Sequence, residues 1–206
     1  MPVAESVEKE TGRVEAFSDA VFAIAITLLV LEFKVPHLPP GAGGRDLFLA
    51  LLKLWPSMIA FLGSFIAILI MWSNHHGVFR LIHRTDSPFL FANGFLLLMV
   101  TFVPFPTAVL AEYLGTPGER VAAAFYIGTF VVTSIAFNVF WATTTKRRLL
   151  RHDVPDAVVV RIRNAYRFGL IVYTASALLA LWNASAGLAA CLSLWLYWSV
   201  LEYRDE

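Results

Sequence analysis

The chain has 206 residues, of which 58% are apolar and 15% are charged, and its mean hydropathy is +0.69. Soluble domains have about 45–50% apolar and about 25% charged residues, so this composition excludes a soluble globular domain and a disordered chain. Sixteen Lys and Arg against 15 Asp and Glu leave a formal net charge of +1, which excludes a nucleic-acid-binding protein. The single Cys191 cannot form an internal disulfide. An integral membrane protein remains.

The first apolar run is short and ends at a proline-rich segment. Extending it from Val14 to Phe33 gives about 20 residues, enough to cross a hydrocarbon core about 30 Å thick. Pro36, Pro39 and Pro40 then prevent the helix from continuing. The polar residues 1–11 lack the basic start and the cleavage site of a signal peptide, so we expect this first helix to be retained.

The distances between successive charged residues define the later spans. Three charge-free runs each fit one helix, whereas the last run contains 34 residues and would be about 51 Å long as a single helix. Turn-forming residues 183–187 lie near its middle and predict a tight hairpin between two helices. The runs lack the alternation of a membrane β-barrel. We predict an all-α membrane protein, one domain over 1–206, with spans at 14–33, 48–72, 88–111, 121–144, 164–182 and 186–202.

Six spans place both termini on one side of the membrane. That side then holds twelve of the sixteen Lys and Arg, and the opposite side holds Lys34, Arg45, Lys53 and Arg120. The positive-inside rule makes the first side cytoplasmic, so we predict a multi-pass plasma-membrane protein with both termini in the cytoplasm. The cluster of basic residues at 146–151 is predicted to anchor this topology near anionic lipid headgroups.

Two polar residues, Ser18 and Asp19, lie where the first helix enters the membrane. Polar groups buried there are costly without partners. They therefore either cap a helix that begins late, or belong to a polar network that ties this helix to its neighbours.

An apolar stripe follows these residues at helical spacing. Ile24, Leu28 and Leu31 share one face of the first helix, and Thr27 lies at its edge. Periodicity does not distinguish a pore wall from a packing seam or a lipid-facing surface. The Thr27 hydroxyl can also simply bond to the carbonyl of Ala23.

The second helix ends in Trp72, Asn74, His75 and His76. Adjacent histidines on a helix point about 100° apart and are poorly placed to share a metal ion, so we predict no metal site. The first two helices run in opposite directions, which brings Asp19 and His75 near the same membrane face. We expect hydrogen bonds between these two groups of residues.

The third predicted helix contains Pro104 and Pro106, which remove backbone donors and predict a kink. Asn93 and Asn138 are predicted to form hydrogen bonds between helices. The sequence contains no nucleophile–base pairing, phosphate loop, dinucleotide fingerprint or zincin motif, and no Thr-Val-Gly-Tyr-Gly carbonyl filter. We therefore expect neither an enzyme nor a cofactor.

Taken together, these features resemble the bacterial members of the lysosomal/endosomal potassium channel family. The resemblance covers essentially the whole chain and is most specific between residues 13 and 32. It is carried by the motifs Arg13-x-x-x-Phe17-Ser18-Asp19, Trp72-x-Asn74-His75-His76-x-x-Phe79 and Pro104-Phe105-Pro106-Thr107-x-x-Leu110-x-Glu112-Tyr113.

This resemblance implies a homotetramer in the lipid bilayer, with a central pore surrounded by four first helices and permeable to potassium and other monovalent cations. Ile24 matches the position of the gating isoleucine, Leu28 and Leu31 match further apolar layers, and Thr27 matches a position that affects ion preference. An intracellular polar network that positions the first helix is implied for Arg13, Phe17, Ser18, Asp19, Trp72, Asn74, His75 and His76.

Two alternatives remain at this point. A proton-coupled or proton-permeable secondary cation transporter would have internal repeats or interrupted helices with charges at the membrane midplane, and neither is evident. An intramembrane enzyme would use His75, His76 and Asp19, and would depend on a metal ion or form a product.

Overall fold

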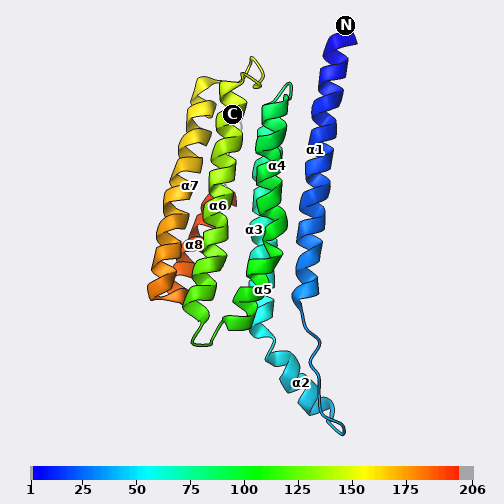
Figure 1. Cartoon of the computed structure of the whole chain (residues 1–206), viewed down its shortest axis with the longest axis vertical. Coiled ribbons are helices and arrows are strands. Elements are labelled where there is room, and N and C mark those ends of the chain that lie inside the picture. Colours follow the sequence, from blue (N-terminus) through cyan, green and yellow to red (C-terminus); the bar gives the residue numbers. More distant parts are fainter. Residues whose placement is uncertain (1, 200–206) are drawn as a thin grey trace.

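Five long apolar helical segments run the length of the molecule. The computed structural model describes residues 2–199, and the segments long and apolar enough to cross a membrane are Thr11–Glu32, Trp55–Phe79, Ser87–Tyr113, Glu119–Lys146 and Asp156–Trp182. In chain order the elements are α1 (Pro2–Leu28), the 3-10 turn η1 (Leu29–Glu32), α2 (Gly44–Leu52), α3 (Trp55–Phe79), α4 (Ser87–Phe102), α5 (Pro104–Tyr113), α6 (Glu119–Lys146), α7 (Asp156–Trp182) and α8 (Ala184–Ser199) (Figure 1).

The first helix begins much earlier than the sequence predicts. α1 is continuous from Pro2, so Ser18 and Asp19 lie in its interior and cap nothing. The capping explanation for these two residues is therefore wrong. The predicted start at 14 followed the apolar run, whereas the polar residues before it are also helical. The outer end tightens into η1, and Phe33 ends the helix in an extended conformation.

The second predicted span, 48–72, is divided by a helix break. Residues 48–52 belong to the short α2, which projects beyond the bundle and buries none of its side chains in the chain (Figure 1). α3 begins at Trp55, directly before Pro56, and continues to Phe79. Proline fits the first turn of a helix and lacks the N–H needed further in, so Pro56 marks a start here.

The third predicted span has the expected interruption, between α4 and α5. Val103 N–H bonds to the Val100 carbonyl three residues earlier at 3.2 Å, because Pro104 begins a new helix directly after it. The Thr107 hydroxyl donates to the Val103 carbonyl at 2.8 Å and contacts the Ser64 hydroxyl at 2.6 Å. The Val103 N–H thus supplies a donor to the Val100 carbonyl, which Pro104 has no N–H to reach.

The hairpin predicted near 183–187 is confirmed as the connection between α7 and α8. Asn183 separates the two helices, and its Oδ1 accepts a bond from the N–H of Ala186 at 3.0 Å. A Cβ atom at Gly187 would lie 2.5 Å from the Cβ of Ala180, so the helices cross too closely there for any side chain.

The boundaries of the last two predicted spans are less accurate. α7 begins at Asp156, eight residues before the predicted 164, because the polar residues before the apolar run continue the helix. α8 has 16 described residues, which make a helix about 24 Å long. Residues 200–202 of the predicted sixth span lie outside the described residues, so a sixth membrane crossing remains a prediction.

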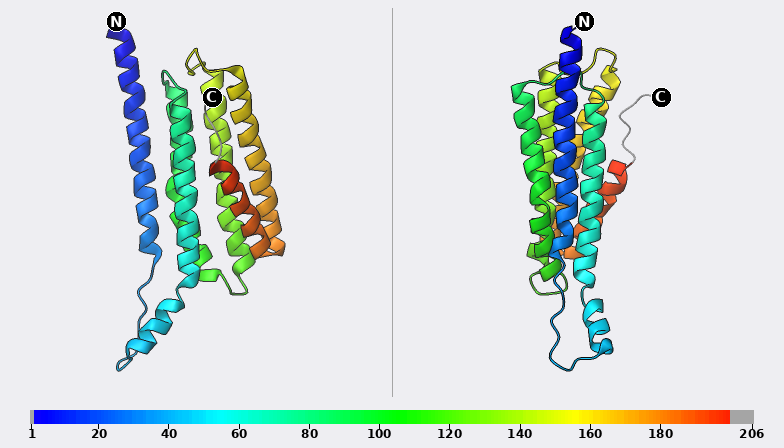
Figure 2. Two further views of the ribbon diagram at one scale, coloured as in Figure 1. Left: turned by 180° about the vertical axis from the view of Figure 1, so that it is seen from behind. Right: turned by 90° about the vertical axis from the view of Figure 1, so that its right-hand side faces the viewer.

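α6 forms the centre of the bundle and α1 forms one edge. α6 contacts α4, α5, α7 and α8, and its Phe130 and Phe140 are fully buried. α1 packs against α3 and α4, at the edge opposite α7, as the two opposing views agree (Figures 1 and 2).

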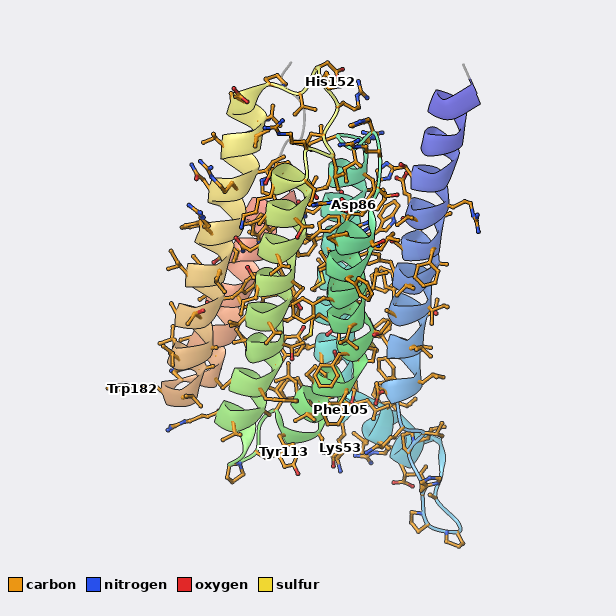
Figure 3. The ribbon with its side chains drawn as sticks, turned by 45° about the horizontal axis from the view of Figure 1, so that its top comes forward. Lys53, Asp86, Phe105, Tyr113, His152 and Trp182 are labelled. Carbon is orange, nitrogen blue, oxygen red and sulfur yellow. The ribbon has the colours of Figure 1, made fainter. Side chains whose placement is uncertain are left out.

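The turns 80–86 and 147–155 meet at one end of the bundle, which we call the basic end. His83 N–H donates to the Leu149 carbonyl at 3.0 Å, and Arg151 N–H donates to the Leu81 carbonyl at 2.8 Å. Asp86 accepts from Arg147 Nε at 2.7 Å and also caps α4 through the N–H of Phe89. Asp86 and His152 mark this end in Figure 3, and Lys53 and Tyr113 mark the other.

Candidate functional site

One face of α1, continued by η1, carries large apolar side chains that are exposed among the described residues. Ile24 is 57% exposed, Leu28 41% and Leu31 71%, and Phe17 lies on the same side nearer the basic end. The opposite face is buried against α3 and α4 and includes Ser18, Phe22, Ala25 and Leu29. The stripe identified from periodicity is thus the outward face of α1.

Thr27 lies within this outward face, beside Ile24 and Leu28. Its Oγ1 is 3.0 Å from the Ala23 carbonyl and 2.9 Å from the Ile24 carbonyl, so the hydroxyl proton is donated to the helix backbone. Its oxygen lone pairs then face outward. The stripe therefore presents one ring of acceptors between apolar layers wherever several copies of α1 face one another.

A ladder of two side-chain pairs joins α1 to α3 near the basic end. Trp72 Nε1 donates to Asp19 Oδ1 at 2.9 Å, and His76 Nδ1 lies 2.9 Å from Glu15 Oε1. On each helix the two residues are four positions apart, which is about one helical turn. Because the two helices are antiparallel, the pairs Trp72–Asp19 and His76–Glu15 lie one above the other. The Trp72 and His76 rings also stack, with centroids 5.8 Å apart. We call these four residues the α1–α3 ladder.

A second, fully buried chain of hydrogen bonds links three helices. Asn93 of α4 donates through Nδ2 to Ser18 Oγ at 2.9 Å, and its Oδ1 lies 2.9 Å from His75 Nε2. Ser18 in turn donates to the Val14 carbonyl. Because Asn93 Oδ1 can only accept, His75 carries a proton on Nε2, an assignment that follows from the network.

Aromatic rings surround the His75 imidazole. Its centroid lies 5.2 Å from that of Phe22, 4.6 Å from that of Phe79 and 5.6 Å from that of Phe140. His75 is therefore fixed both by its bond to Asn93 and by packing against α1, α3 and α6.

Three residues expected in the network lie outside these bonds. Arg13 and Phe17 line a groove of about 450 Å³ between α1 and α4, and among the described residues Arg13 makes no ion pair. Asn74 faces away from α1, donates to the Ile70 carbonyl at 2.8 Å, and lines a small cavity of about 40 Å³ among α3, α6, α7 and α8.

Sequence reasoning missed Glu15 as a member of this site and identified Asn93 only as an interhelical bond. The spacing held a signal for Glu15: it precedes Asp19 by four residues, as Trp72 precedes His76. Two antiparallel helices with matching four-residue spacings predict two rungs rather than one. For Asn93 the sequence offers no such periodic cue, because its partners lie on two other helices.

The two adjacent histidines have different partners, His75 toward α4 and His76 toward α1. Among the described side chains, those of residues 11–199, no three His, Cys, Asp or Glu form a group that could hold a metal ion.

Comparison with known proteins gives consistent results. Residues 13–104 match the family described as endosomal/lysosomal potassium channel TMEM175. A protein named as a potassium channel from Chamaesiphon minutus is 49% identical over 195 residues, which cover 94% of this chain and 95% of that protein. The endosomal/lysosomal proton channel TMEM175 of Bos taurus is 28% identical over 182 residues, 85% of this chain and 38% of that protein.

A solved structure has the same fold. The crystal structure of a lysosomal potassium-selective channel TMEM175 homolog from Chamaesiphon minutus superposes with a TM-score of 0.79. The two chains are 46% identical, and the match covers 94% of this chain and 98% of that one.

Proposed function

Because the chain belongs to the TMEM175 family, we propose that it is a potassium-permeable cation channel whose pore is lined by the outward face of α1. The observation that carries this proposal is the exposure of Ile24, Leu28 and Leu31 on a helix that packs on its other face only. The relative from Chamaesiphon minutus that is named a potassium channel aligns with 94% of this chain, and this similarity supports the same function here.

In the proposed assembly four copies surround a central pore, each contributing one α1. A ring of four Ile24 side chains forms a constriction that is unfavourable for water and ions and so closes the pore by dewetting. Leu28 and Leu31 add apolar layers toward the outer end, and the Thr27 hydroxyls lie between the layers of Ile24 and Leu28. Opening requires only a small outward tilt or rotation of α1.

Selectivity in such a pore arises without a carbonyl filter. Potassium sheds or deforms its hydration shell more easily than sodium, so an apolar constriction favours potassium to a modest degree. The acceptor ring of Thr27 then affects the preference among monovalent cations.

The polar contacts at the basic end hold α1 in position in this proposal. The α1–α3 ladder and the chain from Ser18 through Asn93 to His75 connect α1 to α3 and α4. In this proposal the membrane is the plasma membrane and the basic end faces the cytoplasm, an orientation that the excess of Lys and Arg on that side supports.

Proton permeation through the same pore is the second candidate. It is favoured by the bovine relative, which is named a proton channel. A proton-coupled transporter would use the same helices but would not depend on an apolar constriction at Ile24.

The test is ion flux into liposomes that contain the purified protein. Potassium and sodium flux are compared for the unmodified protein, Ile24→Asn and a matched control, Ile171→Asn, which changes an isoleucine on α7 that is 67% exposed against 57% for Ile24. We expect fast flux down the gradient that favours potassium, increased by Ile24→Asn and unchanged by the control.

Two outcomes contradict the channel proposal. Saturable flux that requires a proton gradient and is indifferent to Ile24→Asn would indicate a transporter. Equal flux changes in the Ile24 and Ile171 variants would make the α1 stripe an ordinary lipid-facing surface. Proton flux that rises in parallel with potassium flux in Ile24→Asn would instead place both ions in one pore.

A further inference from the structure

The outer face of α7 changes character abruptly along its length. From residue 168 to the end of the helix at Trp182, labelled in Figure 3, its exposed large side chains are apolar: Phe168, Ile171, Leu178, Leu179, Leu181 and Trp182. Directly before Phe168, toward the basic end, the exposed side chains are polar: Arg163, Asn164 and Arg167. This face therefore has an apolar stem and a cationic head.

The two arginines of this head repel each other. Arg163 and Arg167 are one helical turn apart on the same face, an arrangement that destabilises a helix when both residues carry the same charge. Among the described residues, neither guanidinium has an ion pair or a hydrogen bond. The nearest acidic residue of α7 is Asp156, about two turns away from Arg163. The pair lacks an anion within this part of the chain.

Along the bundle axis, the cationic head lies some distance inside the basic end and not at the end itself. The backbone carbonyl of Tyr166 accepts a bond from Asn138 Nδ2 of α6 at 3.0 Å. Asn138 is eight residues, or about 12 Å, from the end of α6 at Lys146. Arg167 follows Tyr166 directly, so its backbone lies about 12 Å along the bundle from the end of α6, and its long side chain can reach from an apolar surface toward lipid headgroups.

This surface also lies on the far side of the chain from the candidate pore. α1 and α7 occupy opposite edges of the bundle in both opposing views (Figures 1 and 2). The apolar side chains below Arg167 thus face lipid when α1 faces the pore.

We propose that Arg163, Asn164 and Arg167 form a binding site for the phosphate of an anionic phospholipid from the cytoplasmic leaflet. A phosphate between the two guanidiniums relieves their repulsion and accepts charge-assisted bonds from both, and the Asn164 amide adds a further donor. The acyl chains lie along Phe168 and Ile171. This apolar stem favours a lipid over a free phosphate ion.

The site differs from the general positive charge of the basic end. Arg147 is paired with Asp86, and Arg151 is paired with Asp153, so part of that charge is already neutralised by the protein. Arg163 and Arg167 lie further from the basic end along α7 and have no such partner among the described side chains of residues 11–199.

The test counts bound lipids by native mass spectrometry of the full-length protein in detergent, titrated with phosphatidylglycerol or phosphatidylcholine. We compare the unmodified protein with Arg163→Gln/Arg167→Gln and with the matched control Lys146→Gln/Arg148→Gln, which removes the same charge from exposed residues of the basic end. We expect preferential retention of phosphatidylglycerol, weakened about 30-fold by the α7 substitutions, since each cation near the surface contributes roughly a factor of five. The control should retain it.

A charge-preserving variant, Arg163→Lys/Arg167→Lys, keeps the test decisive if the neutral variant does not fold. It should retain the preference for phosphatidylglycerol over phosphatidylcholine. In the unmodified protein, brominated phosphatidylglycerol should outcompete inorganic phosphate at equal concentration.

Three results would overturn the proposal. Equal losses in the α7 variant and the control would reduce the effect to general surface charge. Displacement of lipid by inorganic phosphate at equal concentration would make the ligand a free anion. A change of oligomeric mass in Arg163→Gln/Arg167→Gln, with lipid binding unaltered, would assign this face to a contact between copies of the chain.

Discussion

α1 and α6 are both long apolar helices of one bundle, but they are held in place by different means. In an apolar stretch of 18 residues within Thr11–Glu32, 22% of the residues are buried, against 56% in the corresponding stretch of α6. α6 is packed on several sides by aromatic rings, among them Phe89 and Tyr166. α1 makes a narrower packing seam and adds the hydrogen bonds of the ladder and of the chain through Asn93.

This difference separates a scaffold from an adjustable element. Aromatic packing depends on many contacts at once and resists displacement. A few directional bonds, by contrast, hold α1 at a defined position and can be exchanged one at a time. The following predictions test this division, from the largest expected effect to the smallest.

The largest effect should come from the scaffold. Phe140→Ala removes a fully buried ring that contacts Phe79, Phe89 and His75, and leaves a cavity that the surrounding helices fill only in part. We expect a loss of about 3–5 kcal/mol in unfolding free energy, measured by denaturation in mixed micelles. Phe91→Ala, at a position that is 81% exposed, is the control and should change stability by far less. Similar losses in both would contradict a packed scaffold.

The next effect should come from the buried hydrogen bonds of α1. Asn93→Leu leaves the Nε2 proton of His75 and the Ser18 hydroxyl without their partner. We expect a loss of about 1–3 kcal/mol, together with a change in flux, because α1 loses its link to α4.

Asn138→Leu is the matched control, since Asn138 joins α6 to the Tyr166 carbonyl within the scaffold. It should lower stability by a similar amount without changing the ratio of potassium to sodium flux. If Asn138→Leu altered flux and Asn93→Leu did not, the roles assigned to the two sides would be reversed.

A smaller effect is expected at one rung of the ladder. Trp72→Phe keeps an aromatic ring beside His76 and removes the bond from Nε1 to Asp19. We expect about 0.5–1.5 kcal/mol of lost stability and a measurable shift in flux. Combining Trp72→Phe with Asp19→Ala should cost little more than either change alone, because both remove the bond between Nε1 and Oδ1. Full additivity of the two changes would show that they act separately.

The smallest effect should appear at the basic end, where Asp86 caps α4. Burial raises the pKa of this carboxyl, but the bonds from Arg147 and from the Phe89 N–H outweigh it, and the net pKa lies below the usual 3.8. The ion pair therefore stabilises the fold above that pH and is lost as the pH falls through the lowered pKa.

Asp86→Asn keeps the cap and removes the charge, so we expect less than about 1 kcal/mol of lost stability at pH 7. The difference from the unmodified protein should disappear in acid, as measured by thermal unfolding between pH 3 and pH 7. A stability difference that grew in acid would mean that folding raises the pKa of Asp86 instead of lowering it.

Much of the architecture follows from the amino-acid sequence. The apolar runs predict the five long spans, the two prolines predict the break at Val103, and the residues around Asn183 predict the hairpin. Each depends on local chemistry: hydropathy, a missing N–H, or a short turn. The interhelical role of Asn93 follows as well, because a polar amide in a membrane helix requires a partner.

Other features depend on information that is not local. Hydropathy ends a span where polar residues begin, whereas the helical backbone of α1 and α7 continues through them. Hydropathy alone merges α2 with α3, because the run that contains both helices is apolar apart from Lys53 and Pro56. Asn74 was grouped with His75 by adjacency along the chain, but neighbouring residues on a helix face different partners.

The four-residue spacing on both sides of the α1–α3 ladder limits how α1 can slide. If α1 moves along α3 by one helical turn, about 6 Å, Asp19 comes opposite His76 and Glu15 comes opposite Arg80. Each carboxylate then again faces a nitrogen-bearing side chain. At half that distance neither carboxylate faces such a side chain, so the four-residue spacing favours discrete positions of α1 along α3 over a continuous range.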